Sequence, residues 1–395
     1  MVSIDALMVL AGVAVVLSVL PLALTLVNLR VYARTRADAA WPDDDPRVFV
    51  CVPARDEAEN LRPCVRGLLS NPERSLRVLI YDDQSTDGTT EIAASLAAED
   101  DRVRIVETQP LPAGWNGKQH ACWRMARAAI DGALGEPAAD ERDLLLFTDA
   151  DVRFASDAIR RSVSTMRELD APMVSTFPRQ VTGSLPESLV VPMMFYLLLG
   201  YLPMPRMRRT VDPSTSAGCG QFLMVTCAAY GASGGHEAFK GSMHDGIKMP
   251  RAVRRAGLRS DLFDGTDLCS VRMYRGLGET WRGFAKNAYE GLGSVGLLVF
   301  MTGVHAVAHV GPWVMLAWAL LSEPARPGLA AACCVAIALQ LAQRVVLSIR
   351  LRHSLVGALL HPLGVVLMTA IQWHSYRQHR AGTRAWRGRV ASSPA

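Results

Sequence analysis

Uncharged residues form long blocks at both ends of the chain. Residues 6–27 contain no charge over 22 positions, which is long enough to cross the hydrocarbon core of a bilayer. Further uncharged runs cover 292–321, 328–343 and 354–373. The pattern predicts an N-terminal anchor and two or three C-terminal membrane segments. The run 354–373, interrupted by His361, Pro362 and Gly364, is expected to be re-entrant or interfacial.

Basic residues predict the orientation. Arg30, Arg34 and Arg36 follow the first run and no Lys or Arg precedes it, so the positive-inside rule places the following region in the cytoplasm. A cleaved signal peptide would instead need basic residues before a shorter apolar core. The sequence therefore predicts a multi-pass protein of the cell membrane. Further arginines mark a cytoplasmic end at Arg344, Arg350 and Arg352, and a basic tail at 376–395 suggests a cytoplasmic C-terminus. Three full C-terminal spans could not satisfy both the orientation of the anchor and a cytoplasmic basic tail.

Short apolar runs alternate with helical patterns in the middle of the chain. Strands are predicted at 48–52, where Pro53 is expected to end the strand, and at 78–81, 103–106 and 144–147, with helices at 58–69, 91–98 and 118–129. This alternation is typical of an α/β fold with a parallel sheet covered by helices on both faces. Ligands bind at the carboxyl ends of the strands in such sheets. The predicted organisation is an anchor at 1–29, a soluble α/β domain at 37–290, membrane segments at 291–375 and the tail.

Composition excludes several classes of protein. Half of the residues are hydrophobic and 20% are charged, which excludes a disordered chain. The net charge of +5 is too small and dispersed to indicate a nucleic-acid partner. The eight cysteines form no Cys-x-x-Cys pair, so neither a zinc ribbon nor a thioredoxin-like site is supported.

Two acidic turns follow predicted strands. Asp149 and Asp151 stand one residue apart after 144–147, and paired carboxylates suit Mg²⁺ or Mn²⁺, which would neutralise a nucleotide diphosphate as it leaves. Asp82 and Asp83 follow 78–81 and could accept hydrogen bonds from a base or a ribose. The alternative for each turn is a solvated loop, or a turn and helix cap, without a ligand.

Three further motifs contain candidate binding residues. Pro53 ends the first predicted strand, Arg55 could pair with a phosphate or a carboxylate, and Glu57 could orient a nucleoside or form a structural pair with Arg55. Lys118 closes a glycine-rich loop at a helix start, where anions bind readily. Asp245 begins a predicted helix at 246–258 and is either an N-cap or a general base.

Two apolar segments are candidates for membrane contact. Trp281 and Phe284 share one face of a predicted helix that also contains Lys286, and the alternative is a helix that only lies on the bilayer. Residues 189–204 are uncharged but short for a span, so they predict an interfacial segment or a buried core helix.

These motifs together resemble the membrane-bound glycosyltransferases of family 2, which have the GT-A fold. The resemblance covers, in order, residues 53–57, 81–89, 114–118, 148–151, 244–245 and 281–287. The tail at 385–389 and the loop at 114–118 are similar to the branch that acts on carotenoids, hopanoids and ceramide-type lipids.

The resemblance implies an inverting transfer of one sugar from a nucleotide-diphospho-sugar to a membrane lipid hydroxyl. Asp82 and Asp83 would hold the nucleoside, Asp149 and Asp151 the metal, and Asp245 would be the base. His244 stands where the family has an acidic residue, and the Gln-x-x-Arg-Trp signature of processive synthases is absent. Residues 281–287 occupy its place, which favours single-sugar transfer. A polyprenyl-phosphate sugar synthase and a non-catalytic nucleotide-sugar-binding subunit remain alternatives.

Overall fold

The computed structural model describes residues 4–382 except 45, 74, 134 and 136, and the backbone of 385–386 and 389–390. The chain forms two compact units. The helical unit comprises Met1–Val31, Gln180–Met204 and Met273–Ala381, and the sheet unit comprises Tyr32–Arg179, Pro205–Arg272 and Gly382–Ala395. These bounds differ from the ranges expected from sequence, because residues 180–204 and 273–290 group with the helical unit.

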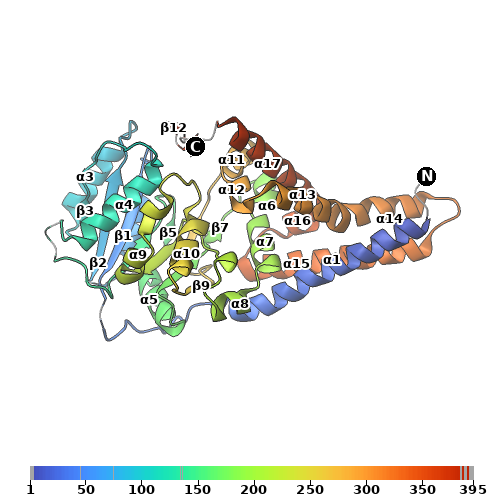
Figure 1. The fold of residues 1–395 in the computed structure, drawn as a ribbon, viewed down its shortest axis with the longest axis horizontal. Helices are drawn as coiled ribbons and strands as arrows, with labels where there is room; N and C mark the ends of the chain where they lie inside the picture. Colours follow the sequence, from blue (N-terminus) through green and yellow to red (C-terminus); the bar gives the residue numbers. More distant parts are fainter. Residues whose placement is uncertain are drawn as a thin grey trace. The chain divides into compact units, whose positions relative to one another are not determined.

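The sheet unit is built on a sheet of seven strands (Figure 1). The order is β3 (Val103–Ile105), β2 (Leu76–Asp82), β1 (Val48–Ala54), β4 (Leu144–Phe147), β8 (Leu223–Thr226), β6 (Met173–Thr176) and β9 (Ser260–Phe263). A smaller sheet has the order β5 (Arg153–Phe154), β10 (Cys269–Val271) and β7 (Arg179–Gln180). The short strands β11 (Ala385–Trp386) and β12 (Arg389–Val390) pair with each other.

Strands β1 to β4 confirm the four predicted strands, and they pair in parallel. The expectation of a wholly parallel sheet was wrong, because β8 runs antiparallel between β4 and β6. Leu223 at the start of β8 pairs with Phe147 at the end of β4, so the loop before β8 lies at the carboxyl end of β4. Pro53 does not end β1, since it pairs with Tyr81. It lies beyond the stretch of β1 that pairs with β4, where its missing N–H is tolerated.

Helices cover both faces of the large sheet, as predicted. Val50 and Val52 of β1 pack into one hydrophobic core and Phe49 and Cys51 into another, because successive strand residues point to opposite faces. The first core includes residues of α2 (Leu61–Leu69), α3 (Thr89–Glu99) and α5 (Ala158–Glu168). The second includes residues of α4 (Gly117–Ile130), α9 (Cys227–Ala232) and α10 (Asp245–Arg255). Short helices α8 (Met204–Arg209), η1 (Pro213–Thr215) and η2 (Gly235–Phe239) complete the unit.

Three helical stretches among the described residues are long and apolar enough to cross a membrane. They are α1 (Ile4–Val31), the continuous run Val295–Leu321, and α15 (Pro327–Leu351), which packs beside α1 (Figure 1). Val295–Leu321 comprises α13 (Val295–Val304), the π-helix η3 (His305–Val310) and α14 (Gly311–Leu321). The run 354–373 forms α16 (Leu355–Leu359) and most of α17 (His361–Ala381), and neither qualifies as a span.

The remaining helices of this unit are α6 (Leu185–Val190), α7 (Met193–Tyr201), α11 (Gly276–Ala285) and α12 (Ala288–Leu292). Within α7, Phe195 and Leu199 are buried, which supports the core-helix interpretation of 189–204 over the interfacial one. Arg344 was expected at a helix end. It lies instead well inside α15 and its side chain is buried, because the helix continues to Leu351.

Candidate active site

The polar turns of the sheet unit meet at the carboxyl ends of β1, β2 and β4. The parallel register places Ala54 opposite Asp82, and the N–H of Asp83 donates to the carbonyl of Ala54 at 2.8 Å. Arg55 leaves β1 at this edge, while Asp149 and Asp151 follow β4. The expectation that these turns share one edge is confirmed.

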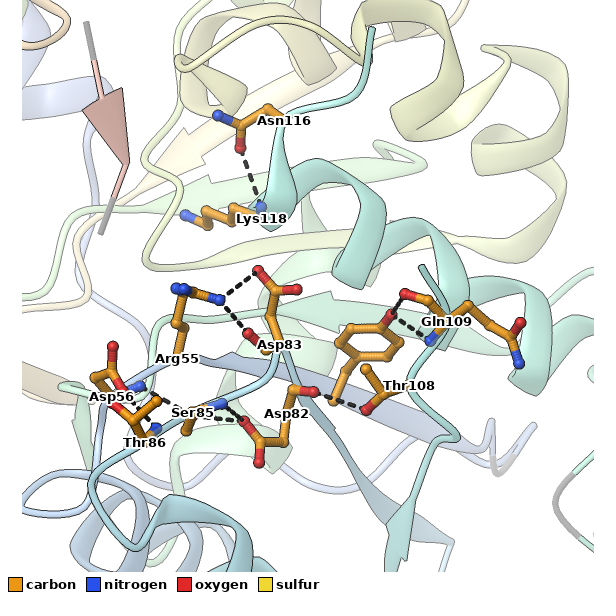
Figure 2. Close-up of polar contacts among 11 residues, drawn as sticks. Arg55, Asp56, Asp82, Asp83, Ser85, Thr86, Thr108, Gln109, Asn116 and Lys118 are labelled. Atoms are coloured by element: carbon orange, nitrogen blue, oxygen red, sulfur yellow. Dashed lines mark hydrogen bonds and ion pairs between the residues drawn. The ribbon is translucent and has the colours of Figure 1, made fainter. Parts of the chain in front are cut away.

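Asp82 organises the turn after β2 (Figure 2). Its Oδ1 accepts a hydrogen bond from the N–H of Ser85 at 3.0 Å, and its Oδ2 accepts one from the hydroxyl of Thr90. Asp83 instead forms an ion pair with Arg55, whose Nη1 lies 3.7 Å from its Oδ2. Asp82 therefore shapes the loop, and Asp83 holds the guanidinium of Arg55.

Glu57 lies in the turn after β1. Its N–H donates to the hydroxyl of Thr89 at 2.9 Å, and its Oε2 accepts from the amide of Asn60 at 2.8 Å. Glu57 is close enough to Asp151 for its charge to act on that carboxyl group.

Asp149 and Asp151 occupy the loop after β4. Burial, the negative charge of Asp149 and that of Glu57 raise the pKa of Asp151 to about 7. The Oδ1 of Asp151 is buried and accepts no hydrogen bond from the described residues. A buried carboxylate oxygen without a donor, surrounded by other acids, is an unfavourable arrangement unless a cation binds there.

Lys118 brings two of the predicted site residues together. The side chain of Asn116 caps α4 by accepting from the N–H of Lys118 at 3.0 Å (Figure 2). The Nζ of Lys118 lies 2.7 Å from Oδ1 of Asp149 and 2.8 Å from Oδ2 of Asp245. Burial alone would lower the pKa of Lys118, but these two carboxylates outweigh it and hold the pKa well above its usual value.

Asp245 is the first residue of α10 and is buried. Its Oδ1 accepts the N–H of Gly246 at 2.8 Å, while the other oxygen contacts Lys118. Burial raises its pKa, but the charge of Lys118 and the hydrogen bond from it prevail, so the pKa lies below the usual value. The N-cap interpretation of Asp245 was wrong, because His244 is the N-cap and Asp245 is the first residue inside α10. Its role as a general base stays a prediction.

Sequence reasoning missed the loop before β8. A side chain carbon on Gly220 would lie 2.2 Å from Oδ1 of Asp245, so this position has no room for one. Thr148 also donates to the carbonyl of Gln221 at 2.8 Å, which ties the loop to the end of β4. The two glycines of Gly218-Cys219-Gly220 were the available signal. They allow the backbone to approach the carboxylate of Asp245 closely.

Trp281, Phe284 and Lys286 belong to the helical unit. Trp281 and Phe284 pack on one apolar cluster with Leu189 and Ile371, and Lys286 is the C-cap of α11. The indole N–H of Trp281 donates to Nδ1 of His374 at 2.7 Å. Trp281 also lines a cavity of about 470 Å³ with Ala370, Trp373, His374 and Arg377.

The residues after β4 supply some, but not all, of the ligands that a divalent cation needs. Asp149 and Asp151 supply hard oxygen ligands, and the unpartnered Oδ1 of Asp151 is suited to one. Within the described part of the chain no cluster of three or more His, Cys, Asp or Glu side chains has the arrangement of a metal site. A metal held here would therefore take its remaining ligands from a bound diphosphate or from water, as Mg²⁺ commonly does.

The family known as glycosyltransferase-like family 2 matches residues 46–264, which is more than half of the chain. The chain belongs to this family. Its fold is similar to that of a mannosyltransferase from Pyrobaculum calidifontis solved with GDP-Man and Mn²⁺, with a TM-score of 0.52 and 18% identity over 93% of this chain and 98% of that one. The fold is therefore of the GT-A type, and the chain is a glycosyltransferase.

Two curated relatives share a name. The 4,4'-diaponeurosporenoate glycosyltransferase of Staphylococcus haemolyticus is 25% identical over 231 residues, which cover 58% of this chain. This chain spans only 56% of that relative's length. The protein of the same name from Staphylococcus aureus strain USA300 is 22% identical over 363 residues, covering 87% of this chain and 88% of the relative.

Proposed function

We propose that this glycosyltransferase transfers one sugar, with inversion, from a nucleotide-diphospho-sugar to a hydroxyl of a membrane lipid. The contact that carries this proposal is the ion pair between Lys118 and Asp245 at 2.8 Å, beside Asp149. It places an ionised carboxylate next to the residues expected to hold the donor. A carotenoid, a hopanoid or another terpenoid or glycolipid is the acceptor class.

The donor would lie across the carboxyl ends of β1, β2 and β4. Asp83 and Glu57 would supply acceptors for the nucleoside. Asp82 shapes the turn beside it, and Pro53 lies near the end of β1, paired with Tyr81 of β2. Arg55 and Lys118 supply positive charge for the diphosphate. Asp149 and Asp151 would hold Mg²⁺ or Mn²⁺, which when bound would neutralise charge on the diphosphate.

Asp245 would act as the general base. Its lowered pKa keeps it ionised, so it can accept the proton of the acceptor hydroxyl. The hydroxyl oxygen then bonds to the anomeric carbon as the bond from that carbon to the diphosphate breaks. A single displacement of this kind inverts the anomeric configuration and releases the nucleoside diphosphate.

The lipid nature of the acceptor is supported by the helical unit. Three helical stretches of the described chain are long and apolar enough to cross a membrane, which supports a lipid acceptor, and two relatives are named diaponeurosporenoate glycosyltransferases. The cavity beside Trp281 has two indole rings and the exposed cation Arg377 among its lining residues, which suits the polar end of an amphiphile. Trp281, Phe284 and Lys286 are therefore assigned to the acceptor and membrane side.

The decisive experiment replaces Asp245 with Asn and measures turnover of UDP- and GDP-sugars with a membrane lipid extract. Loss of a general base lowers kcat by a factor of about 10²–10⁴, while KM for the donor changes little. Lys240→Met is a matched control, because Lys240 is exposed and contributes only its backbone to a contact with Asn116.

The same variant separates the alternatives. A polyprenyl-phosphate acceptor needs no strong base, so Asp245→Asn would keep most of its rate and the lipid-hydroxyl proposal would fail. If the chain were a non-catalytic subunit, the wild type and Asp245→Asn would both bind nucleotide-sugars and neither would turn them over. The paired Asp149 and Asp151 favour an active enzyme over that alternative.

A further inference from the structure

A cluster of polar side chains lies inside the helical unit, apart from the residues assigned to sugar transfer. Tyr196 of α7 contacts His309 of the π-helix, with 2.7 Å between its hydroxyl and Nε2. Nδ1 of His309 lies 3.3 Å from Nε2 of His361, the first residue of α17. All three side chains are buried. Charged and polar groups buried among membrane helices usually mark functional sites.

Arg344 of α15 brings a positive charge to this cluster. The residue is 1% exposed and lies within electrostatic range of Tyr196, His353 and His361. Its one hydrogen bond to the described residues runs from Nη2 to the carbonyl of Gly357, at 3.5 Å. Among the described residues no carboxylate forms an ion pair with Arg344, and its Nε has no hydrogen-bond partner.

Two buried ring nitrogens near Arg344 also lack a hydrogen-bond partner among the described residues. Nδ1 of His361 and Nε2 of His353 are buried and make no hydrogen bond with the described residues. A buried guanidinium without an anion is strongly unfavourable, since its desolvation is not repaid by a partner. The arrangement is therefore complementary to a negatively charged group, and a planar guanidinium matches the oxygens of a carboxylate or a phosphate.

We propose that Arg344, together with His361 and His353, binds the carboxylate or phosphate of a membrane amphiphile. Arg344 lies seven positions before Leu351 at the end of α15, which is about 10 Å along the helix axis. At that depth the acidic group of a lipid can reach the guanidinium from the interface while its chain stays among the apolar helices. This site is independent of the sugar transfer proposed above.

The test compares thermal unfolding midpoints of the full chain in phosphatidylcholine nanodiscs. Arg344→Met removes the unpaired buried charge, so the midpoint without acidic lipid should rise by several degrees. Phosphatidylglycerol or oleate should raise the midpoint of the wild type and leave that of Arg344→Met unchanged. Arg344→Lys keeps the charge without the planar fork and should retain a weaker response.

Controls separate this site from general surface charge. Arg380→Met removes an exposed cation from α17 and should respond to acidic lipid as the wild type does. A midpoint of Arg344→Met below that of the wild type, or failure of that variant to fold, would show that Arg344 is structural and overturn the proposal. The proposal would also be overturned if neither phosphatidylglycerol nor oleate raised the unfolding midpoint of the wild type. The same conclusion would follow if inorganic phosphate alone raised that midpoint to the same extent.

Discussion

Charge in the candidate active site is balanced by one lysine shared between two carboxylates. Lys118 contacts Asp149 and Asp245, whereas Asp151 keeps a buried oxygen without a donor among the described residues. The positive charge of Lys118 therefore balances the negative charges of Asp245 and Asp149. The carboxylate of Asp151 is left available for a cation.

Exchange of Asp151 for Asn should weaken Mn²⁺ binding in the presence of a nucleoside diphosphate and lower transfer by at least about 10²-fold, because a hard cation loses an anionic ligand. Electron paramagnetic resonance of Mn²⁺ measures the binding. EDTA should abolish transfer by the wild type, and added Mn²⁺ or Mg²⁺ should restore it. Full activity in the chelator, with no metal bound, would contradict a metal role for Asp149 and Asp151.

Gly220 offers a second test of single-residue geometry. Gly220→Ala places a methyl group 2.2 Å from where Oδ1 of Asp245 lies, so the carboxylate must move. We expect kcat to fall by about tenfold or more, because misplacement of a catalytic group by about 1 Å is already costly. Gly231→Ala in α9 is the matched control, since its new carbon meets nothing within 4 Å. Equal rates for the two variants would refute the argument.

The elements of the sheet unit depend on contacts that are distant in sequence as well as on local pattern. Arg254, near the end of α10, is 2% exposed and donates to the carbonyls of Met207 and Thr210 at 2.6 and 2.9 Å. It also donates to the hydroxyl of Ser260 in β9 at 2.8 Å. One side chain thus joins α10, α8 and β9.

Arg254→Met should reduce the free energy of unfolding by about 3 kcal/mol, because several buried acceptors lose their donor at once. Thermal unfolding of the purified protein measures the change. The neighbouring Arg255→Met removes an exposed side chain of the same type and should have an effect below about 0.5 kcal/mol. Equal destabilisation by both variants would argue against this role of Arg254.

Orientation in the membrane is a property of the whole chain. If α1 carries residues 32 onward into the cytoplasm, the two later candidate spans, Val295–Leu321 and Pro327–Leu351, return the chain to the same side. Arg350 and Arg352 then lie at a cytoplasmic end, and so does the basic tail. Two later spans thus satisfy the charge pattern without a third crossing by 354–373.

A cysteine at Ala138 tests this orientation, because Ala138 is exposed in the sheet unit. In a Cys334→Ala background, which removes the exposed native thiol, an impermeant maleimide added to intact cells should not label Ala138→Cys. Labelling should appear once the cells are permeabilised. Efficient labelling of intact cells would reverse the predicted topology.

Local pattern was sufficient for features that depend on neighbours in sequence. The alternation of apolar runs and helical stretches predicted β1 to β4 and the helices between them, since side-chain periodicity follows backbone geometry. Uncharged length predicted α1, Val295–Leu321 and α15 in the same way. The acidic turns were placed at one edge because parallel strands all end there.

Features that join distant segments required the folded chain. The antiparallel insertion of β8 depends on pairing between residues 144–147 and 223–226, which no local period encodes. The contact of Lys118 with Asp245, the clearance at Gly220 and the burial of Arg344 likewise join residues far apart in sequence. Sequence identifies which groups are charged or apolar, whereas their partners and their exclusion from water follow from packing of the whole unit.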